Sequence, residues 1–436
     1  MLITSIAAFN IKSNLLFFIP HDPANTKVHV SHTTLMTLFA SASACLVLYA
    51  FRDVLLANTS FDFFLPLIIY ILLFLNLNFL ESYWLAKSQP NFVMYFSIVR
   101  TAVRLGGVIG TAILTKSVVA MMYALCAIEA IRIVAVAIIM ARTGILKLSL
   151  DKSVLQQQLS FVMPLAISGS LNHTSQYIGQ IAISVHLGVV ALAIYTIANF
   201  QVPILNIVRG AIGDSIFPSM VRQATDQTRD GLRLWKRANI AYTFLIIPYF
   251  VIVTWYADVL IPWIFTDEYS DAVPLFRVLA LFLLTQCFEF SSPLRAIRKT
   301  KDLLVGTTLM LTTNVALIFF FFRYLPDIAI FGPAVGYVTG NVVQTLFYGW
   351  RITNIYHVPL DQLLKWRSLA LIGVCTLAAC VPLLAGEFVT LNDFVRVPTF
   401  LILFAAVYLA AIRYVRLEEV ETVIEAVTAR LRRNAK

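Results

Sequence analysis

Apolar stretches alternate with short polar loops along the whole chain, and basic residues are concentrated in every second loop. Of the 33 Lys and Arg residues, Arg132 lies inside an apolar stretch, and five occur in the other set of loops: Arg52, Lys116, Arg277, Arg323 and Arg396. Loops rich in Lys and Arg stay on the cytoplasmic side, because basic side chains resist translocation during insertion. The alternation therefore predicts a multi-pass protein of an inner (plasma) membrane with a cytoplasmic C-terminus.

Composition supports the same class. The chain of 436 residues is 59% hydrophobic and 13% charged, with a mean hydropathy of +0.82, which leaves too little polar surface for a soluble protein. The net charge of +10 is spread over separate loops, so it favours anionic lipid head groups and predicts no nucleic-acid partner. The five cysteines lie in apolar segments without CxxC spacing, which predicts neither disulfides nor a metal site, and no cofactor is expected.

A membrane-spanning helix needs about 20 apolar residues. The stretches that approach this length are 1–18, 33–51, 61–80, 93–115, 118–140, 161–183, 187–208, 240–262, 272–290, 303–322, 328–350, 369–384 and 397–412. The first contains Asn10, Lys12 and Asn14 and is neither a clean span nor a signal peptide. We expect residues 21–32 to form a cytoplasmic loop.

Loop lengths argue against an enzyme, because no loop has room for a folded domain. The chain also contains no GxxxxGK[ST], HExxH or GxSxG motif. The function class that remains is a transporter driven by an ion gradient or by its substrate gradient. Residues 417–433 carry apolar side chains at helical spacing, which predicts an amphipathic helix on the cytoplasmic leaflet or, alternatively, against the inner loops.

The stretch 161–183 carries polar side chains on one helical face. They are Ser168, Asn172, His173, Gln176 and Gln180. Lipid offers such groups no partner, so the stripe predicts a water-accessible cavity with these residues as substrate-binding groups. The alternative is that they hydrogen-bond adjacent helices, at about 1 kcal/mol each.

Charged side chains also occur inside apolar stretches. Glu129 and Arg132 are one turn apart near the middle of their segment, where each charge alone would cost about 2.5 to 3.5 kcal/mol. Arg100 and Arg104 share a helix face. We predict that the three arginines bind an anionic substrate and that Glu129 and Glu289 are ion-coupling carboxylates. A buried structural ion pair, and arginines that reach the cytoplasmic interface, are the alternatives.

Small residues and prolines mark helix packing and kinks. Gly332, Gly336 and Gly340 form GxxxGxxxG, and Gly106 and Gly110 form GxxxG, which are typical of closely packed membrane helices. The prolines inside predicted segments indicate kinked helices, which suit a protein that changes access. They are Pro66, Pro164, Pro203, Pro248 and Pro333.

A family resemblance is visible from residue 161 onward. The segments FVMPLAISGSLNHTSQYIGQIAISVHLGVVALAIYTIANFQVPILNIV and GDSIFPSMVRQ resemble the lipid-linked oligosaccharide flippases of polysaccharide (O-antigen) biosynthesis, in the multidrug, oligosaccharidyl-lipid and polysaccharide exporter superfamily. The matching features are Pro164, Leu187-Gly188, Tyr195 and Phe217-Pro218, and residues 260–281 resemble the family's ninth-to-tenth helix junction.

This resemblance implies an all-α, polytopic transmembrane bundle of about 12 to 13 helices in two pseudo-symmetric lobes. The lobes would comprise residues 1–150 and 151–360, and residues 361–436 would supply an extra helix pair and the amphipathic tail. Two departures accompany it. The family's first helix and part of its second are not found, and Gln176 and Gln180 stand where many relatives carry an acidic residue.

The resemblance implies a transporter that flips a polyprenyl-pyrophosphate-linked glycan from the cytoplasmic to the periplasmic leaflet of a bacterial inner membrane, for lipopolysaccharide or capsular polysaccharide assembly. Amides, a hydroxyl, a histidine and arginines suit sugars and a pyrophosphate. Its partners would be the lipid-linked oligosaccharide, the bilayer and other polysaccharide assembly proteins. The alternatives are a drug/cation antiporter of the same superfamily, a membrane glycan polymerase or ligase, and a truncated inactive paralogue or scaffold.

Overall fold

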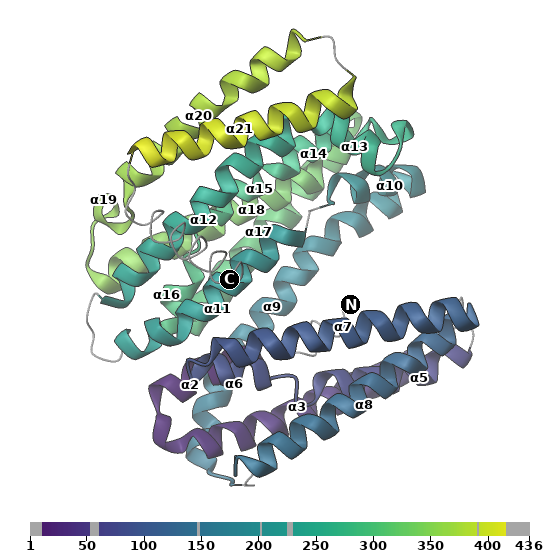
Figure 1. Cartoon of the computed structure of the whole chain (residues 1–436), viewed down its shortest axis with the longest axis vertical. Coiled ribbons are helices and arrows are strands. Elements are labelled where there is room, and N and C mark those ends of the chain that lie inside the picture. Colours follow the sequence, from purple (N-terminus) through teal and green to yellow (C-terminus); the bar gives the residue numbers. More distant parts are fainter. Residues whose placement is uncertain are drawn as a thin grey trace, which may run out of the picture. The chain divides into compact units, whose positions relative to one another are not determined.

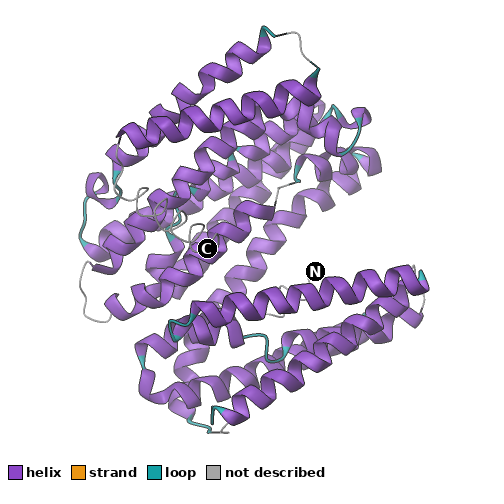
Figure 2. Ribbon diagram, in the orientation of Figure 1, coloured by secondary structure: helices purple, strands orange, loops and turns teal. Residues whose placement is uncertain are grey.

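The chain is helical throughout its described part. The computed structural model describes residues 11–52, 61–145, 149–200, 203–224, 230–389 and 392–415, and every regular element in these ranges is a helix (Figure 2). Eight of these helices are long and apolar enough to cross a membrane. The predicted all-α, polytopic bundle is therefore confirmed. The predicted amphipathic tail, residues 417–433, lies outside the described residues.

The described residues form two compact units. Unit 1 comprises Met1–His173, Asp214–Thr228 and Ala296–Leu304, and unit 2 comprises Thr174–Gly213, Arg229–Arg295 and Val305–Lys436. The unit boundary does not fall near residue 150, because α9 (Lys152–His186) is one continuous helix that contributes to both units. The three-part division drawn from the family resemblance stays a prediction.

Unit 1 is built from antiparallel helices (Figure 1). They are α2 (Ile11–His21), α3 (Thr26–Ala50), α5 (Phe61–Leu75), α6 (Leu80–Ala86), α7 (Pro90–Thr115), α8 (Val118–Arg142) and the first part of α9. α5 packs against α3 and α8, and α7 packs against α6 and α8. The turn between α7 and α8 is short because Lys116 adopts φ 49°, which ends one helix, and Ser117 caps the next by accepting from Ala120 N.

The predicted loop over residues 21–32 is too long, because the connection between α2 and α3 ends at Asn25. α3 begins at Thr26, and its first turns bury His29 and His32, which are 1% and 0% exposed. Hydropathy did not reveal this helix start because polar partners, not apolar contacts, stabilise it. Gln158 on α9 links the two imidazoles, at 2.9 Å from His32 Nδ1 and 3.2 Å from His29 Nδ1. The backbone N–H of Asp151 completes the network by donating to His32 Nε2.

Unit 2 contains the remaining helices. They are the second part of α9, α10 (Gly188–Ala198), α11 (Pro203–Ala224, shared with unit 1), α12 (Asp230–Trp255), α13 (Ala257–Ile264), α14 (Ala272–Ala280), α15 (Phe282–Gln286), α16 (Ser291–Ala296), α17 (Thr300–Tyr324, whose first residues belong to unit 1), α18 (Gly332–Tyr356), α19 (Leu360–Leu363), α20 (Trp366–Glu387) and α21 (Asp393–Val415). α14 packs against α10 and α18. The predicted single segments 187–208 and 240–262 are each divided into two helices.

Glycines bring α17 and α18 into close contact, as predicted. A Cβ added at Gly340 would lie 2.6 Å from the carbonyl oxygen of Met310, and one at Gly336 would lie 2.6 Å from Asn314 Oδ1. In α7 the close approach occurs at a different glycine. A Cβ at Gly107 would meet Ile128 at 2.4 Å, whereas Gly106 and Gly110 have no described neighbour within 4 Å of theirs.

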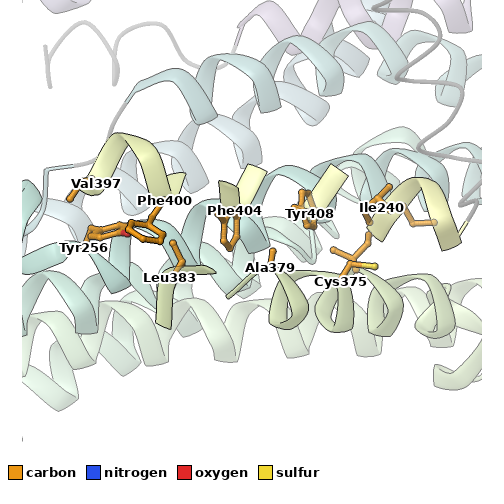
Figure 3. Packing of buried hydrophobic residues seen from close by; sticks show 11 residues of the cluster. Ile240, Tyr256, Cys375, Ala379, Leu383, Val397, Phe400, Phe404 and Tyr408 are labelled. Carbon is orange, nitrogen blue, oxygen red and sulfur yellow. The ribbon is translucent and has the colours of Figure 1, made fainter. Parts of the chain in front are cut away.

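The C-terminal helix pair has its own core. α20 and α21 pack against each other and α20 packs against α12, with a continuous row of buried side chains between them (Figure 3). Phe404 is 1% exposed, and Tyr408 donates a 2.8 Å hydrogen bond to the carbonyl of Phe244. The outward faces expose Leu377 and Ile402, at 70% and 69%. Apolar side chains facing outward are expected where lipid is the solvent.

Candidate functional site

A helix break lies inside one membrane span of unit 1. α5 ends at Leu75 and α6 begins at Leu80, within the span Phe64–Ala86, and Leu77 adopts φ 53° in the turn between them. Backbone carbonyls at such a break lose their helical partners, and in the membrane they need others. Asn76 at the break is held by α3, because its Nδ2 donates to Ser41 Oγ at 2.9 Å.

Arg132 on α8 satisfies the carbonyls of the break. Its guanidinium donates to the carbonyl oxygens of Leu73 (2.8 Å), Phe74 (3.3 Å), Asn76 (2.9 Å) and Leu77 (3.1 Å). Its Nε donates to Glu129 Oε2, one turn earlier on the same helix. Arg132 is 7% exposed and Glu129 is 1% exposed. All three guanidinium nitrogens are thus engaged inside unit 1, and the two buried charges compensate each other.

Arg100 and Arg104 lie beside the break on one face of α7. Arg100 Nη1 donates to Glu81 Oε1 at 3.3 Å, and the same oxygen accepts from Ser97 Oγ at 3.1 Å. Arg104 Nη2 donates to the hydroxyl of Tyr70 at 2.5 Å. All five side chains belong to half-buried residues. Each arginine is held by a partner from one of the two helices that flank the break, Arg100 by Glu81 on α6 and Arg104 by Tyr70 on α5.

Aromatic rings support the two arginines. The guanidinium carbon lies 5.9 Å from the centroid of the Phe74 ring for Arg100 and 5.7 Å for Arg104. The Arg104 guanidinium also lies 5.8 Å from the Tyr70 centroid. A ring face attracts a guanidinium electrostatically without forming hydrogen bonds. The two cations are therefore kept close together while most of their N–H donors keep no acceptor among the described residues.

These residues form one charged cluster, which we call the arginine cluster: Tyr70, Phe74, Glu81, Arg100, Arg104, Glu129 and Arg132. It holds three guanidiniums and two carboxylates, which leaves one positive charge uncompensated. Sequence reasoning found the arginines and Glu129 but missed Tyr70 and Glu81. Glu81 lies one residue past the predicted segment 61–80, so it resembled a loop residue. The helical spacing of Leu80 to Ala86 was the signal that could have found it.

The polar stripe lies along α9. Asn172 is exposed, and Ser168, His173, Gln176 and Gln180 are half-buried. The helix is packed beside this stripe: Ser175 accepts a hydrogen bond from Asn314 at 2.9 Å, and a Cβ at Gly179 would approach Pro333 to 2.6 Å. At about 100° per residue, Ser175 and Gly179 lie within about 20° of Ser168, so packing against α17 and α18 reaches the edge of the stripe. Its first three residues belong to unit 1, with the arginine cluster, and the two glutamines belong to unit 2.

Glu289 lies between α15 and α16 in unit 2. Its carboxylate accepts from Ser291 Oγ and, at 3.2 Å, from the backbone N–H of Ser292, so it caps the start of α16. Its own N–H donates to Asn239 Oδ1 at 3.3 Å, and its carbonyl accepts from Trp235 Nε1 at 2.6 Å. Within the described residues, Glu289 and the arginine cluster are in different units.

The described residues contain no group of three or more His, Cys, Asp or Glu side chains that could hold a metal ion. All five cysteines are free thiols.

Several transporters of known structure share the fold. A MOP superfamily transporter from Pyrococcus furiosus, described for the reverse polarity of its binding pocket, is 15% identical with a TM-score of 0.66, over 81% of this chain and 84% of that one. An outward-facing multidrug resistance MATE transporter is 15% identical with a TM-score of 0.67, over 82% and 86% of the two chains. A mutant MATE transporter of Vibrio cholerae is 16% identical with a TM-score of 0.65, over 82% and 87%.

No curated protein matches the chain. Residues 1–274 match the model of a family described as polysaccharide biosynthesis protein. This match spans more than half of the chain and includes the segments from residue 161 onward that carry the resemblance. The chain belongs to the polysaccharide biosynthesis protein family and has the fold of MOP superfamily transporters.

Proposed function

We propose that this protein is a multi-pass inner-membrane transporter that flips a polyprenyl-pyrophosphate-linked glycan from the cytoplasmic to the periplasmic leaflet by alternating access. The glycan would serve the assembly of lipopolysaccharide, as O-antigen, or of capsular polysaccharide. The observation that carries the proposal is the pair of guanidiniums on α7, half-buried in a span, with unused N–H donors and a net positive surrounding. Membership of the polysaccharide biosynthesis family supports a glycan as cargo.

The head group determines which residues can serve. A pyrophosphate diester is doubly negative, and carrying it through low dielectric without a nearby cation would be prohibitively costly. Arg100 and Arg104 are suited to bind it, because a guanidinium can donate two parallel hydrogen bonds to phosphate oxygens. Arg132 contributes positive charge to the same cluster while its N–H groups hold the helix break.

The polar stripe suits the sugars. Amide and hydroxyl side chains donate to and accept from sugar hydroxyls without requiring a fixed charge. Asn172, Gln176 and Gln180 occupy one face of α9, together with Ser168 and His173. We propose that this face contacts the glycan, while the polyprenyl tail stays in lipid.

A cation antiporter is less well supported. Such a transporter needs a carboxylate free to bind its ion or its cationic drug. Glu129 is paired with Arg132, and Glu289 caps α16 through one of its two carboxylate oxygens. The Pyrococcus furiosus transporter is described as having a pocket of reverse polarity and a different function. We infer that the net positive arginine cluster of this protein favours an anionic cargo.

Transport by the purified protein tests the proposal. We expect proteoliposomes to move a fluorescently labelled polyprenyl-pyrophosphate oligosaccharide between leaflets, measured as the fraction of label reached by an impermeant quencher. The cationic dye ethidium should not be transported, because the arginine cluster repels it. Transport of ethidium without movement of the lipid would contradict the proposal and favour the antiporter.

Substitutions in α9 test the role of the stripe. Gln176→Leu and Gln180→Leu are each expected to reduce export about tenfold, the effect of losing roughly 1.4 kcal/mol of binding. Protein abundance should stay near normal, because neither side chain is fully buried. The matched control is Gln156→Leu, the same change at an exposed position of the same helix. A collapse in abundance for both stripe variants would show that the stripe supports helix packing and not substrate binding.

A further inference from the structure

The carboxylate of Glu81 forms an ion pair with Arg100, one of the two neighbouring arginines of α7. Within the described residues it is the acidic group in contact with Arg100, at 3.3 Å, and its side chain is 22% exposed against 18% for Arg100. Ser97 donates to the same carboxylate oxygen at 3.1 Å. Glu81 therefore holds the guanidinium in place with an internal anion, in a position that solvent or a ligand can reach.

The helix break places Glu81 there. α6 starts at Leu80, directly after the turn whose carbonyls Arg132 binds. Glu81 lies in the first turn of α6 and approaches Arg100 on α7, which packs against α6. The partner of Arg104 is different, because it is the neutral hydroxyl of Tyr70. The carboxylate thus neutralises one of the two neighbouring guanidiniums and leaves the other charged.

A doubly negative head group cannot simply be added to this arrangement. Arg100 and Arg104 together carry two positive charges, which match a diphosphate, but Glu81 already supplies one negative charge. A phosphate that binds Arg100 through parallel hydrogen bonds shares that guanidinium with the Glu81 carboxylate, which contacts Nη1. Like charges at such distances repel strongly outside bulk water. Glu81 and the head group therefore compete for Arg100.

We propose that Glu81 is an internal competitor of the anionic head group, which displaces it from Arg100 on binding and which it helps to expel on release. This inference rests on the proposed function and specifies how its binding site is regulated. A transporter must bind its cargo tightly enough to admit it and weakly enough to release it, as in ion conduction. Glu81 lowers the affinity of the site, because each binding event must first break the Glu81–Arg100 ion pair.

Binding to the purified full-length protein tests this role. The probe is farnesyl pyrophosphate, a short polyprenyl diphosphate, titrated calorimetrically into wild type and Glu81→Gln. We expect the variant to bind about tenfold more tightly, the scale of one charge-assisted hydrogen bond. In the flipping assay the same variant should turn over more slowly, because release is impaired. Asp258→Asn is the matched control: it removes one carboxylate from an exposed ion pair, with Arg277, and should leave both quantities unchanged.

Each outcome decides a different point. If wild type binds the probe and Glu81→Gln binds it equally or more weakly, the competitor role is overturned, while the proposed function stands. If neither protein binds it, both proposals fail. Glu81→Asp keeps the negative charge, but its shorter side chain places the carboxylate farther from Arg100. This variant should bind farnesyl pyrophosphate with an affinity between those of wild type and Glu81→Gln, and it tests the competitor role even if the glutamine variant is unstable.

The source of the anion is distinguished by inorganic pyrophosphate. If inorganic pyrophosphate binds more weakly than farnesyl pyrophosphate, and Glu81→Gln tightens the binding of both, the ligand of the site is a lipid head group. Equal binding with the same effect supports the competitor role but identifies a soluble diphosphate as the ligand, which overturns the lipid cargo. If wild type and Glu81→Gln bind inorganic pyrophosphate with the same affinity, the competitor role is overturned.

Discussion

Export of the lipid-linked glycan is expected to fall at least about a hundredfold when Arg100 and Arg104 are both replaced by Ala, because two charge-assisted hydrogen-bonding groups, at about 1.5 to 3 kcal/mol each, are lost. The fold should tolerate the change, since both residues are half-buried and each donates one hydrogen bond to a neighbouring side chain. Measuring flipping per molecule of correctly folded protein separates transport from abundance.

Two variants sharpen this prediction. Replacing both arginines by Lys keeps the charge but removes the planar fork, so export should recover only in part. Arg277→Ala removes a guanidinium that is paired with Asp258 in unit 2, and it should leave export unchanged. Wild-type flipping by the double Ala variant would show that the head group does not use this pair.

Arg132→Ala is expected to destabilise the protein by about 3 to 5 kcal/mol, because removing one partner of a buried ion pair leaves the other charge uncompensated. Glu129, at 1% exposure, would lose its cation. The carbonyls of Leu73, Asn76 and Leu77 would lose their donors inside a span. A large drop in melting temperature and in the amount of monodisperse protein is the expected measurement.

A double variant separates the effect of the uncompensated Glu129 charge from the effect of the lost carbonyl hydrogen bonds. Glu129→Gln with Arg132→Ala removes the uncompensated charge but leaves the break carbonyls without donors, so stability should recover only partly. Transport should stay absent, because the break that positions Glu81 and α6 would remain unsupported. A double variant with wild-type stability would mean that the carbonyl contacts contribute little, and full transport would place the substrate cation elsewhere.

Average hydropathy and charge are enough to locate most of the membrane helices. The predicted segment 118–140 corresponds to α8 (Val118–Arg142), and 93–115 corresponds to α7 (Pro90–Thr115). In lipid, every backbone group of a span must be satisfied within it, so a long apolar stretch has few alternatives to a helix. The glycines of α18 were predictable for a related reason, because small residues are what allow two membrane helices to approach closely.

Helix starts stabilised by polar contacts were not predictable in this way. His29 and His32 lie inside α3 because Gln158, more than a hundred residues later in the chain, hydrogen-bonds to both imidazoles. A window of local hydropathy contains no information on that partner. The same limitation applies to the interrupted span between Leu75 and Leu80, which resembles an ordinary apolar segment until Arg132 is placed beside it.

The sequence by itself determined that this is an all-helical membrane protein, and it pointed to Arg100, Arg104, Glu129 and Arg132, because charge inside an apolar stretch is visible without coordinates. Only the tertiary structure decided how those charges differ. Arg132 is engaged by the backbone of a broken helix, whereas Arg100 and Arg104 keep N–H donors that no described residue accepts. The difference depends on contacts between helices that are distant in sequence, and these arise only when the helices pack.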